Sequence, residues 1–150
     1  MNRSFTILLL IAAGISLIVQ NLLMVRITAT ASTVLIALVI NSGAGLGLLL
    51  LLLLGRNGLD GIVEAVGTIR PWSLLPGLLG SFFVFAGIHG YQRIGAASTI
   101  AVLVASQLVT GLIVDASRST SANYFQSHAF SVLGGVLLIA GAFLVVRRSF

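Results

Sequence analysis

The chain has 150 residues, of which 58% are hydrophobic and only 7% are charged, and its mean hydropathy is +1.16. Soluble proteins carry about 25% charged residues, and a domain this small could not bury so much apolar surface. The net charge of +5 comes from single arginines scattered along the chain, not from a basic stripe that would follow phosphates. The composition therefore excludes a soluble enzyme, a disordered tail and a nucleic-acid binder, and leaves a small membrane protein.

Five apolar segments are long enough to cross a bilayer, because a helix needs about 20 residues to span ~30 Å of hydrocarbon. We expect spans at residues 5–25, 33–54, 72–89, 95–114 and 129–146. None shows the alternation of apolar and polar residues that marks a barrel strand. The first run is also too long for the core of a signal peptide. The sequence predicts an all-α integral membrane protein with five transmembrane helices in a single domain, residues 1–150.

The connections between the spans differ in length. Residues 26–32 and 90–94 are predicted to be tight turns. Residues 55–71 form the longest connection, where apolar residues alternate with Asp60 and Glu64 at a spacing that suits a short helix in the headgroup plane. Glycines in the same segment weaken any helix there, so a helix and an irregular loop both stay open.

The arginines are balanced across the membrane. With five spans, Arg3, Arg56, Arg70 and Arg118 fall on one side, and Arg26, Arg93, Arg147 and Arg148 fall on the other. Orientation is normally set by an excess of Lys and Arg on the cytoplasmic side, and here the excess is zero. Chance would explain this balance, but insertion in both orientations explains it better. We therefore expect two inverted copies to pair as an antiparallel homodimer, which would reproduce in ten helices the inverted repeats of many transporters.

Small residues recur on single faces of three spans. Helices in lipid associate where small residues let their backbones approach, so these positions predict helix packing rather than ligand contact. The packing glycines are Gly43 and Gly47 in the second span, Gly77, Gly80 and Gly87 in the third, and Gly134 and Gly141 in the fifth. Gly135 and Ala142 lie one step around the fifth helix. The sequence does not distinguish packing within one chain from a dimer seam.

Uncharged polar and aromatic side chains are the candidates for substrate contact. Asn41 and Ser42 fall near the middle of the second span, and Ser98 and Gln107 lie in the fourth. An amide in hydrocarbon needs a partner, which either a substrate or a neighbouring helix can supply. Phe82 and Phe85 could form apolar walls, although plain packing is the simpler interpretation. Gln20 and Asn21 are assigned to the membrane interface, as are the belt aromatics Trp72 and Tyr91.

Ionisable groups are absent from the middle of every span, which counts against the simplest proton-coupled exporter of polycations. His89 and Asp115 stand at the ends of the third and fourth spans, where a structural role is the simpler interpretation and proton coupling the alternative. Two histidines without any cysteine do not predict a metal site. We expect no enzyme activity, no cofactor and no metal.

Several short motifs resemble a known family. They are the segments Gly77–Val84 (GLLGSFFV) and Arg93–Thr99 (RIGAAST), then Ser106–Gln107, Asp115, the Leu133–Gly134 and Ala140–Gly141 pairs, and Gln20 with Arg26 after it. Together they resemble the YdcZ-like family of small bacterial inner-membrane proteins, which belongs to the drug/metabolite transporter superfamily with the EamA-like relatives. The resemblance implies five-span units, some of dual topology, with a transport role. Met24, Asn41 and Ser106 depart from the family's more usual Asn, Ser and Gly, which weakens the transfer of a pore-lining role to Gln20 or Gln107.

The sequence thus predicts a transporter of small organic solutes in the bacterial inner membrane, working by alternating access as a homodimer. Substrate contacts are expected from Asn41, Ser42, Phe82, Phe85, Ser98 and Gln107. Two other functions stay open. A passive ion or solute channel is one, and an assembly subunit that does not itself transport is the other.

Overall fold

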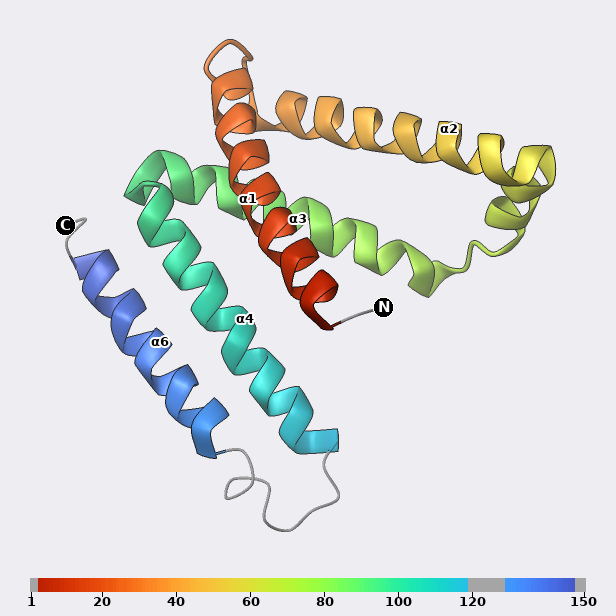
Figure 1. Cartoon of the computed structure of the whole chain (residues 1–150). Helices are drawn as coiled ribbons and strands as arrows, with labels where there is room; N and C mark the ends of the chain where they lie inside the picture. Colours follow the sequence, from red (N-terminus) through yellow and green to blue (C-terminus); the bar gives the residue numbers. More distant parts are fainter. Residues whose placement is uncertain (1–2, 119–128, 148–150) are drawn as a thin grey trace. The chain divides into compact units, whose positions relative to one another are not determined.

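The computed structural model describes residues 3–118 and 129–147, and every regular element in these ranges is helical. The elements are α1 (Arg3–Thr28), α2 (Val34–Gly67), the 3-10 turn η1 (Pro71–Leu74), α3 (Leu75–Ile94), α4 (Ala96–Arg118) and α6 (Ala129–Arg147) (Figure 1). Five of these segments are long and apolar enough to cross a membrane. The predicted all-α fold is confirmed. Arg148 of the arginine balance lies outside the described residues.

The chain divides into two compact units, residues 1–89 and 90–150, with the boundary inside α3. In the first unit the end of α1 and the start of α2 are joined by the short connection 29–33, as the predicted turn requires (Figure 1). Its core is a cluster of Met24 from α1, Ala37 from α2 and Ile88 from α3, each 2% exposed or less. These three helices therefore meet at the end of the unit where α1 leads into α2.

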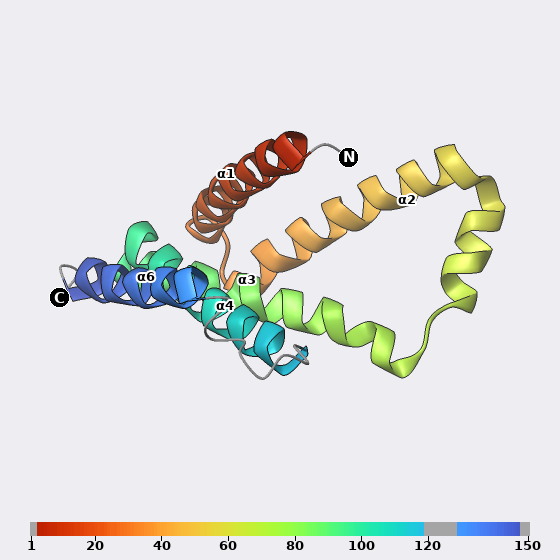
Figure 2. The ribbon, with the colours of Figure 1, turned by 60° about the horizontal axis from the view of Figure 1, so that its bottom comes forward.

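Helix α2 extends well beyond its predicted end and bends at Gly58 (Figures 1 and 2). Gly58 has φ 64° and ψ −156°, a conformation that is essentially restricted to glycine. The part before the bend is about 24 residues long, or about 36 Å, which is enough to cross the bilayer. The short helix considered for the connection 55–71 exists as the continuation of α2 to Gly67, where the hydroxyl of Thr68 donates to the carbonyl of Glu64 at 2.8 Å. Its place in the headgroup plane stays a prediction.

In the second unit α4 and α6 lie side by side (Figures 1 and 2). The face of α6 that contacts α4 carries Gly135 and Ala142, both buried. A Cβ atom on Gly135 would lie 2.9 Å from Cδ1 of Leu112, so the absence of a side chain allows the close approach. The sequence analysis named Gly134 and Gly141 as the packing positions, whereas within this unit the contact lies one step around the helix.

The turn between α3 and α4 consists of the single residue Gly95, with φ 81°. The predicted turn at residues 90–94 is wrong, because α3 continues through Ile94. The carbonyl of Gly95 accepts hydrogen bonds from the backbone N–H of Thr99 at 3.1 Å and from its hydroxyl at 2.8 Å. Across the turn, Thr99 packs on Gly90, where an added Cβ would lie 2.6 Å from Cγ2 and 2.7 Å from Oγ1 of Thr99. The two helix ends are therefore held against each other by a glycine and a threonine.

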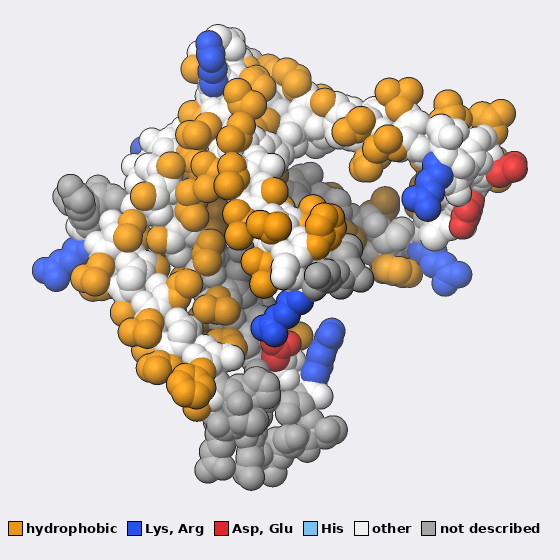
Figure 3. Space-filling model, viewed as in Figure 1, with side chains coloured by type: hydrophobic (Ala, Val, Ile, Leu, Met, Phe, Trp, Pro, Cys, Tyr) orange, Lys and Arg blue, Asp and Glu red, His pale blue; other side chains and the backbone are white. Residues whose placement is uncertain are grey.

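Apolar side chains cover the sides of the helices, and the charged side chains gather near helix ends (Figure 3). Leu51 and Leu52 of α2, for example, are 69% and 60% exposed, and Phe143 of α6 is 65% exposed. Such large apolar surfaces are not stable in water. The five apolar helices instead match a lipid bilayer as their surroundings.

We expect Gly90→Ala to lower the free energy of unfolding by about 1–3 kcal/mol, because the new methyl group would overlap the short, stiff side chain of Thr99. Reversible unfolding in mixed detergent micelles measures the change. Gly111→Ala is the control, since a Cβ there meets no described atom within 4 Å. Adding Thr99→Ala should restore part of the loss in the Gly90 variant. Equal stability of the Gly90 and Gly111 variants would contradict this packing.

Candidate functional site

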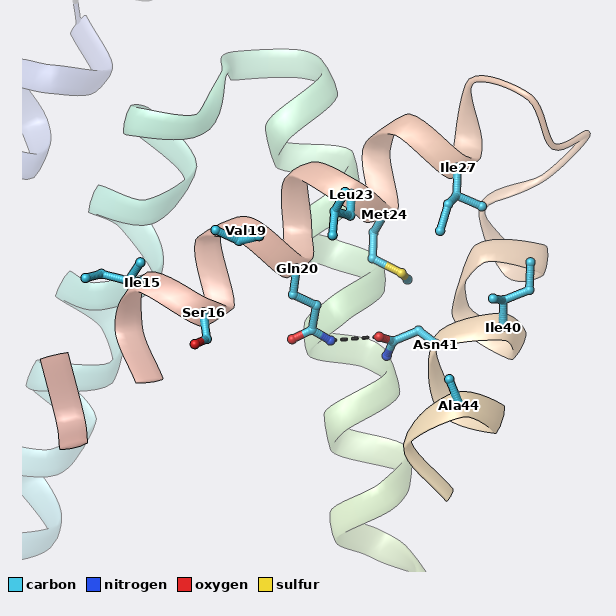
Figure 4. A pocket seen from close by; sticks show the side chains of 10 residues that line it. All are labelled: Ile15, Ser16, Val19, Gln20, Leu23, Met24, Ile27, Ile40, Asn41 and Ala44. Atoms are coloured by element: carbon cyan, nitrogen blue, oxygen red, sulfur yellow. Dashed lines mark hydrogen bonds between the residues drawn. The ribbon is translucent and has the colours of Figure 1, made fainter. Parts of the chain in front are cut away.

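A hydrogen bond between two amide side chains joins α1 and α2 inside their apolar stretches. Nε2 of Gln20 donates to Oδ1 of Asn41 at 2.9 Å, and both residues are half-buried (Figure 4). Polar side chains within a membrane must find partners, and bonds between helices are one way to satisfy them. Asn41 therefore has a helix–helix partner, and that partner is a residue that the sequence analysis had assigned to the interface.

The amide pair lies in a groove of about 510 Å³ between α1 and α2. Three of its lining side chains are polar, Ser16, Gln20 and Asn41, and the other seven are apolar (Figure 4). The apolar members are Ile15, Val19, Leu23, Met24, Ile27, Ile40 and Ala44. A volume in this range, a mostly apolar wall and a few converging polar groups are typical of sites for small molecules.

The depth of the pair follows from helix geometry. Gln20 is eight positions before the end of α1 at Thr28, and Asn41 is seven positions after the start of α2 at Val34. At 1.5 Å per residue, both amides lie about 10–12 Å from the α1–α2 connection. Because α2 runs on to Gly58 before it bends, Asn41 lies about a third of the way along its straight part, not near its middle as the sequence suggested.

Asn21 is the next residue along α1, and it faces a different neighbour. It is only 3% exposed, and its Oδ1 has no hydrogen-bond partner among the described residues. A Cβ on Gly87 of α3 would lie 3.8 Å from this oxygen. Gly87, predicted to pack against another helix, is thus buried against α1, and Asn21 is a core residue of the first unit, while its depth in the membrane stays a prediction.

The other predicted side chains of the first unit lie on exposed faces. Ser42 is exposed next to Asn41, and Phe82 of α3 is 69% exposed. Phe85 and His89 are paired on α3, with ring centroids 4.3 Å apart. Nδ1 of His89 donates to the carbonyl of Phe85 at 3.0 Å. This bond within the helix fixes the imidazole ring at the end of the third span.

The second unit contains the remaining candidates. Ser98 is 2% exposed and lies beside Thr99 at the α3–α4 turn, whereas Gln107 and Asp115 are exposed on α4. Tyr91, predicted as an interfacial belt residue, is buried, and its hydroxyl has no partner among the described residues. Trp72 is 66% exposed, as a belt residue would be. The structure therefore buries Ser98 near the α3–α4 turn and leaves Gln107 exposed on α4.

Most of the predicted packing glycines have open space around them within the described chain. No atom lies within 4 Å of a Cβ built on Gly43, Gly47, Gly77, Gly80, Gly134 or Gly141. The glycines in tight contact are Gly61, Gly90 and Gly135, whose Cβ positions fall within 3 Å of a neighbouring side-chain atom. The open glycine faces stay predictions for contacts outside the unit that carries each of them.

Comparison with known proteins adds to this geometry. A family model described as "Putative inner membrane exporter, YdcZ" matches residues 5–144. The chain belongs to the YdcZ family. It is 55% identical, over 150 residues and the full length of both chains, to the inner membrane protein YdcZ of Escherichia coli strain K12. No solved structure matches the chain.

Membership of this family and the five apolar helices identify a multi-pass protein of the bacterial inner membrane. The family description supports a role in membrane transport rather than in catalysis. The resemblance noted from short motifs in the sequence is confirmed. Among residues 3–118 and 129–147 no group of three or more His, Cys, Asp or Glu side chains is placed to hold a metal ion.

The contribution of the amide pair can be measured with a double-mutant cycle. We expect Gln20→Leu and Asn41→Leu to show a coupling of about 0.6–1.7 kcal/mol, the range found for hydrogen bonds between helices in membranes. Unfolding in mixed micelles gives the free energies. Gln20→Leu combined with Ser81→Ala should be additive, because the hydroxyl of Ser81 is bonded within its own helix to Gly77. Additivity of the two Leu substitutions would show that the amides are not coupled.

Proposed function

We propose that the protein moves small organic solutes across the inner membrane by alternating access, as a dimer of two inverted copies. The observation that carries the proposal is the uncharged amide pair of Gln20 and Asn41 within an apolar groove of a membrane-spanning unit. The two amides line an open groove, where a solute could contact them in addition to their mutual bond. The family description, an inner membrane exporter, supports transport as the general role and outward movement as its direction.

The proposed substrate contacts are polar and aromatic residues of each unit. In the first unit, Asn41 lines the groove, Ser42 follows it on α2, and Phe82 and Phe85 lie on α3. In the second unit, the proposed contacts are Ser98 and Gln107. If protons drive transport, His89 and Asp115 at the span ends would be the coupling groups. Because none of these side chains is charged inside a span, the proposed solutes are not highly charged.

An inverted dimer is supported by the arginines and by the open glycine faces. The structure places Arg26, Arg93, Arg118 and Arg147 in the last turns of their helices, where they can reach the headgroups. The equal tally on the two sides therefore concerns residues outside the hydrocarbon core. A second copy would cover the glycines that meet no atom in the described chain, and such glycines suit close helix contact.

Topology reporters at the C-terminus test the inverted dimer. We expect signal from both sides of the membrane for the natural chain. Arg26→Ser should shift the C-terminus toward the periplasm, and Arg70→Ser should shift it toward the cytoplasm, because each removes one charge from opposite sides of a balanced set. A C-terminus on a single side that neither substitution moves would contradict dual topology. It would favour a parallel dimer or an assembly subunit that needs a partner.

Purified protein in liposomes tests the transport mechanism. A thermal-shift screen of metabolites selects the solute, and uptake of the labelled solute into preloaded vesicles is then measured. A carrier working by alternating access should show saturable exchange that is accelerated by internal solute, and Asn41→Leu should reduce it at least tenfold. Ion currents or uptake without saturation would instead identify a passive channel. Absence of any flux from protein of either orientation would favour the assembly subunit.

A further inference from the structure

The α1–α2 groove combines an apolar wall with a small set of uncharged polar atoms. None of its ten lining residues carries a charge, and only Ser16, Gln20 and Asn41 are polar. A charged ligand bound here would lose its hydration without gaining a counter-charge from the wall. An uncharged molecule with an apolar body avoids this loss.

The amide pair keeps unused hydrogen-bonding capacity on all four of its polar atoms. Each side-chain amide offers two donor hydrogens and one acceptor oxygen with two lone pairs. The bond from Nε2 of Gln20 to Oδ1 of Asn41 uses one hydrogen and one lone pair, so Oε1 of Gln20 stays available as an acceptor, and Nδ2 of Asn41 and the second hydrogen of Nε2 stay available as donors. Figure 4 shows the two side chains pointing toward each other from α1 and α2, with Oε1 of Gln20 on the side of its amide away from Asn41. Each amide group therefore presents a donor nitrogen next to an acceptor oxygen.

This pattern does not depend on the direction of the internal bond. Rotating both amides by half a turn reverses the bond, and the pair then offers the NH₂ of Gln20 and the oxygen of Asn41. One donor and one acceptor remain available in either state. Ser16 lies one turn before Gln20 on the same helix face and lines the same groove, so its hydroxyl adds a third polar contact.

We propose that this groove binds uncharged small molecules that carry a donor and an acceptor side by side, such as a primary carboxamide or a lactam, on an apolar body. The inference rests on the proposed transport function and names the substrate class of its site. A carboxamide would pair its donor and acceptor with the remaining acceptor and donor atoms of the amide pair, and its apolar body would lie against Val19 and Leu23. Lipid tails cannot replace either hydrogen bond, so a molecule that lacks one of the two groups leaves a polar atom of the site unpaired.

The test compares three probes of similar size: 2-naphthamide, methyl 2-naphthoate and 2-naphthamidine. The amide has a donor and an acceptor, the ester has only acceptors, and the amidine is a cation. Binding to the full-length protein in lipid nanodiscs is measured by equilibrium dialysis, with empty nanodiscs as the reference for partition into lipid. We expect the amide to bind at least tenfold more tightly than the ester or the amidine.

Substitutions of the two amide residues test whether the probe binds at the pair of Gln20 and Asn41. Gln20→Leu and Asn41→Leu should each weaken the amide at least tenfold and weaken the ester much less, whereas Asn41→Gln, which keeps an amide, should retain part of the affinity. Ser81→Ala on α3, whose hydroxyl is bonded to its own helix, should bind all three probes like the natural chain. Thermal unfolding of each variant identifies those that do not fold.

Two results would overturn the inference: equal binding of amide and ester by the natural chain, or amide binding that neither Leu substitution weakens. Tighter binding of the amidine would also overturn it, because the site would then select a cation. The experiments can refute the substrate class and the transport function independently of each other. Saturable exchange of another solute without amide binding would refute this substrate class but keep the carrier, whereas amide binding without any flux would keep the site and refute the transport function.

Discussion

The structure depends on one constraint: hydrocarbon offers no hydrogen bonds, so every polar group in the membrane must find its partner within the protein. The backbone meets this constraint by remaining helical through all five apolar segments. The described polar side chains inside the spans respond to it in different ways. Hydroxyls such as that of Ser81 bond to their own helix, Gln20 and Asn41 bond to each other across two helices, and the buried Oδ1 of Asn21 has no partner among the described residues. The bonded pair of amides leaves donor and acceptor capacity beside a groove.

Much of the fold could be predicted because the same constraint is visible in the sequence. Apolar runs of about 20 residues indicate spans regardless of tertiary contacts, and all five spans were found. The residues at which the helices begin and end were harder to predict from the sequence. Helix α3 passes through Gly90, on which Thr99 packs, and a glycine in contact with another helix has the same local signal as a glycine in a turn. Past the predicted end of the second span, Gly58 interrupts the helical conformation of α2, and the helix resumes in a new direction.

The candidate site was only partly predictable. Asn41 stood out as an amide within a span, but its partner Gln20 is separated by 21 positions and is identified only by how α1 and α2 cross. For the same reason the sequence could not select the face of α6 that contacts α4. Gly134 and Gly135 differ by one step around a helix whose composition is apolar on every side, and only the contact with Leu112 of α4 selects Gly135. Composition locates a helix in the membrane, whereas side-chain contacts determine which of its faces meets a neighbour.

The unequal lengths of the helices have a consequence for the surrounding lipid. The straight part of α2 is about 36 Å long, while the 19 residues of α6 cover about 28 Å. A single bilayer thickness cannot match both when they stand upright. Helix α2 must tilt, or the lipid around it must thicken, while α6 fits with little adjustment. Hydrophobic mismatch of this kind makes the inclination of α2, and with it the width of the groove beside Asn41, sensitive to the acyl-chain length of the membrane.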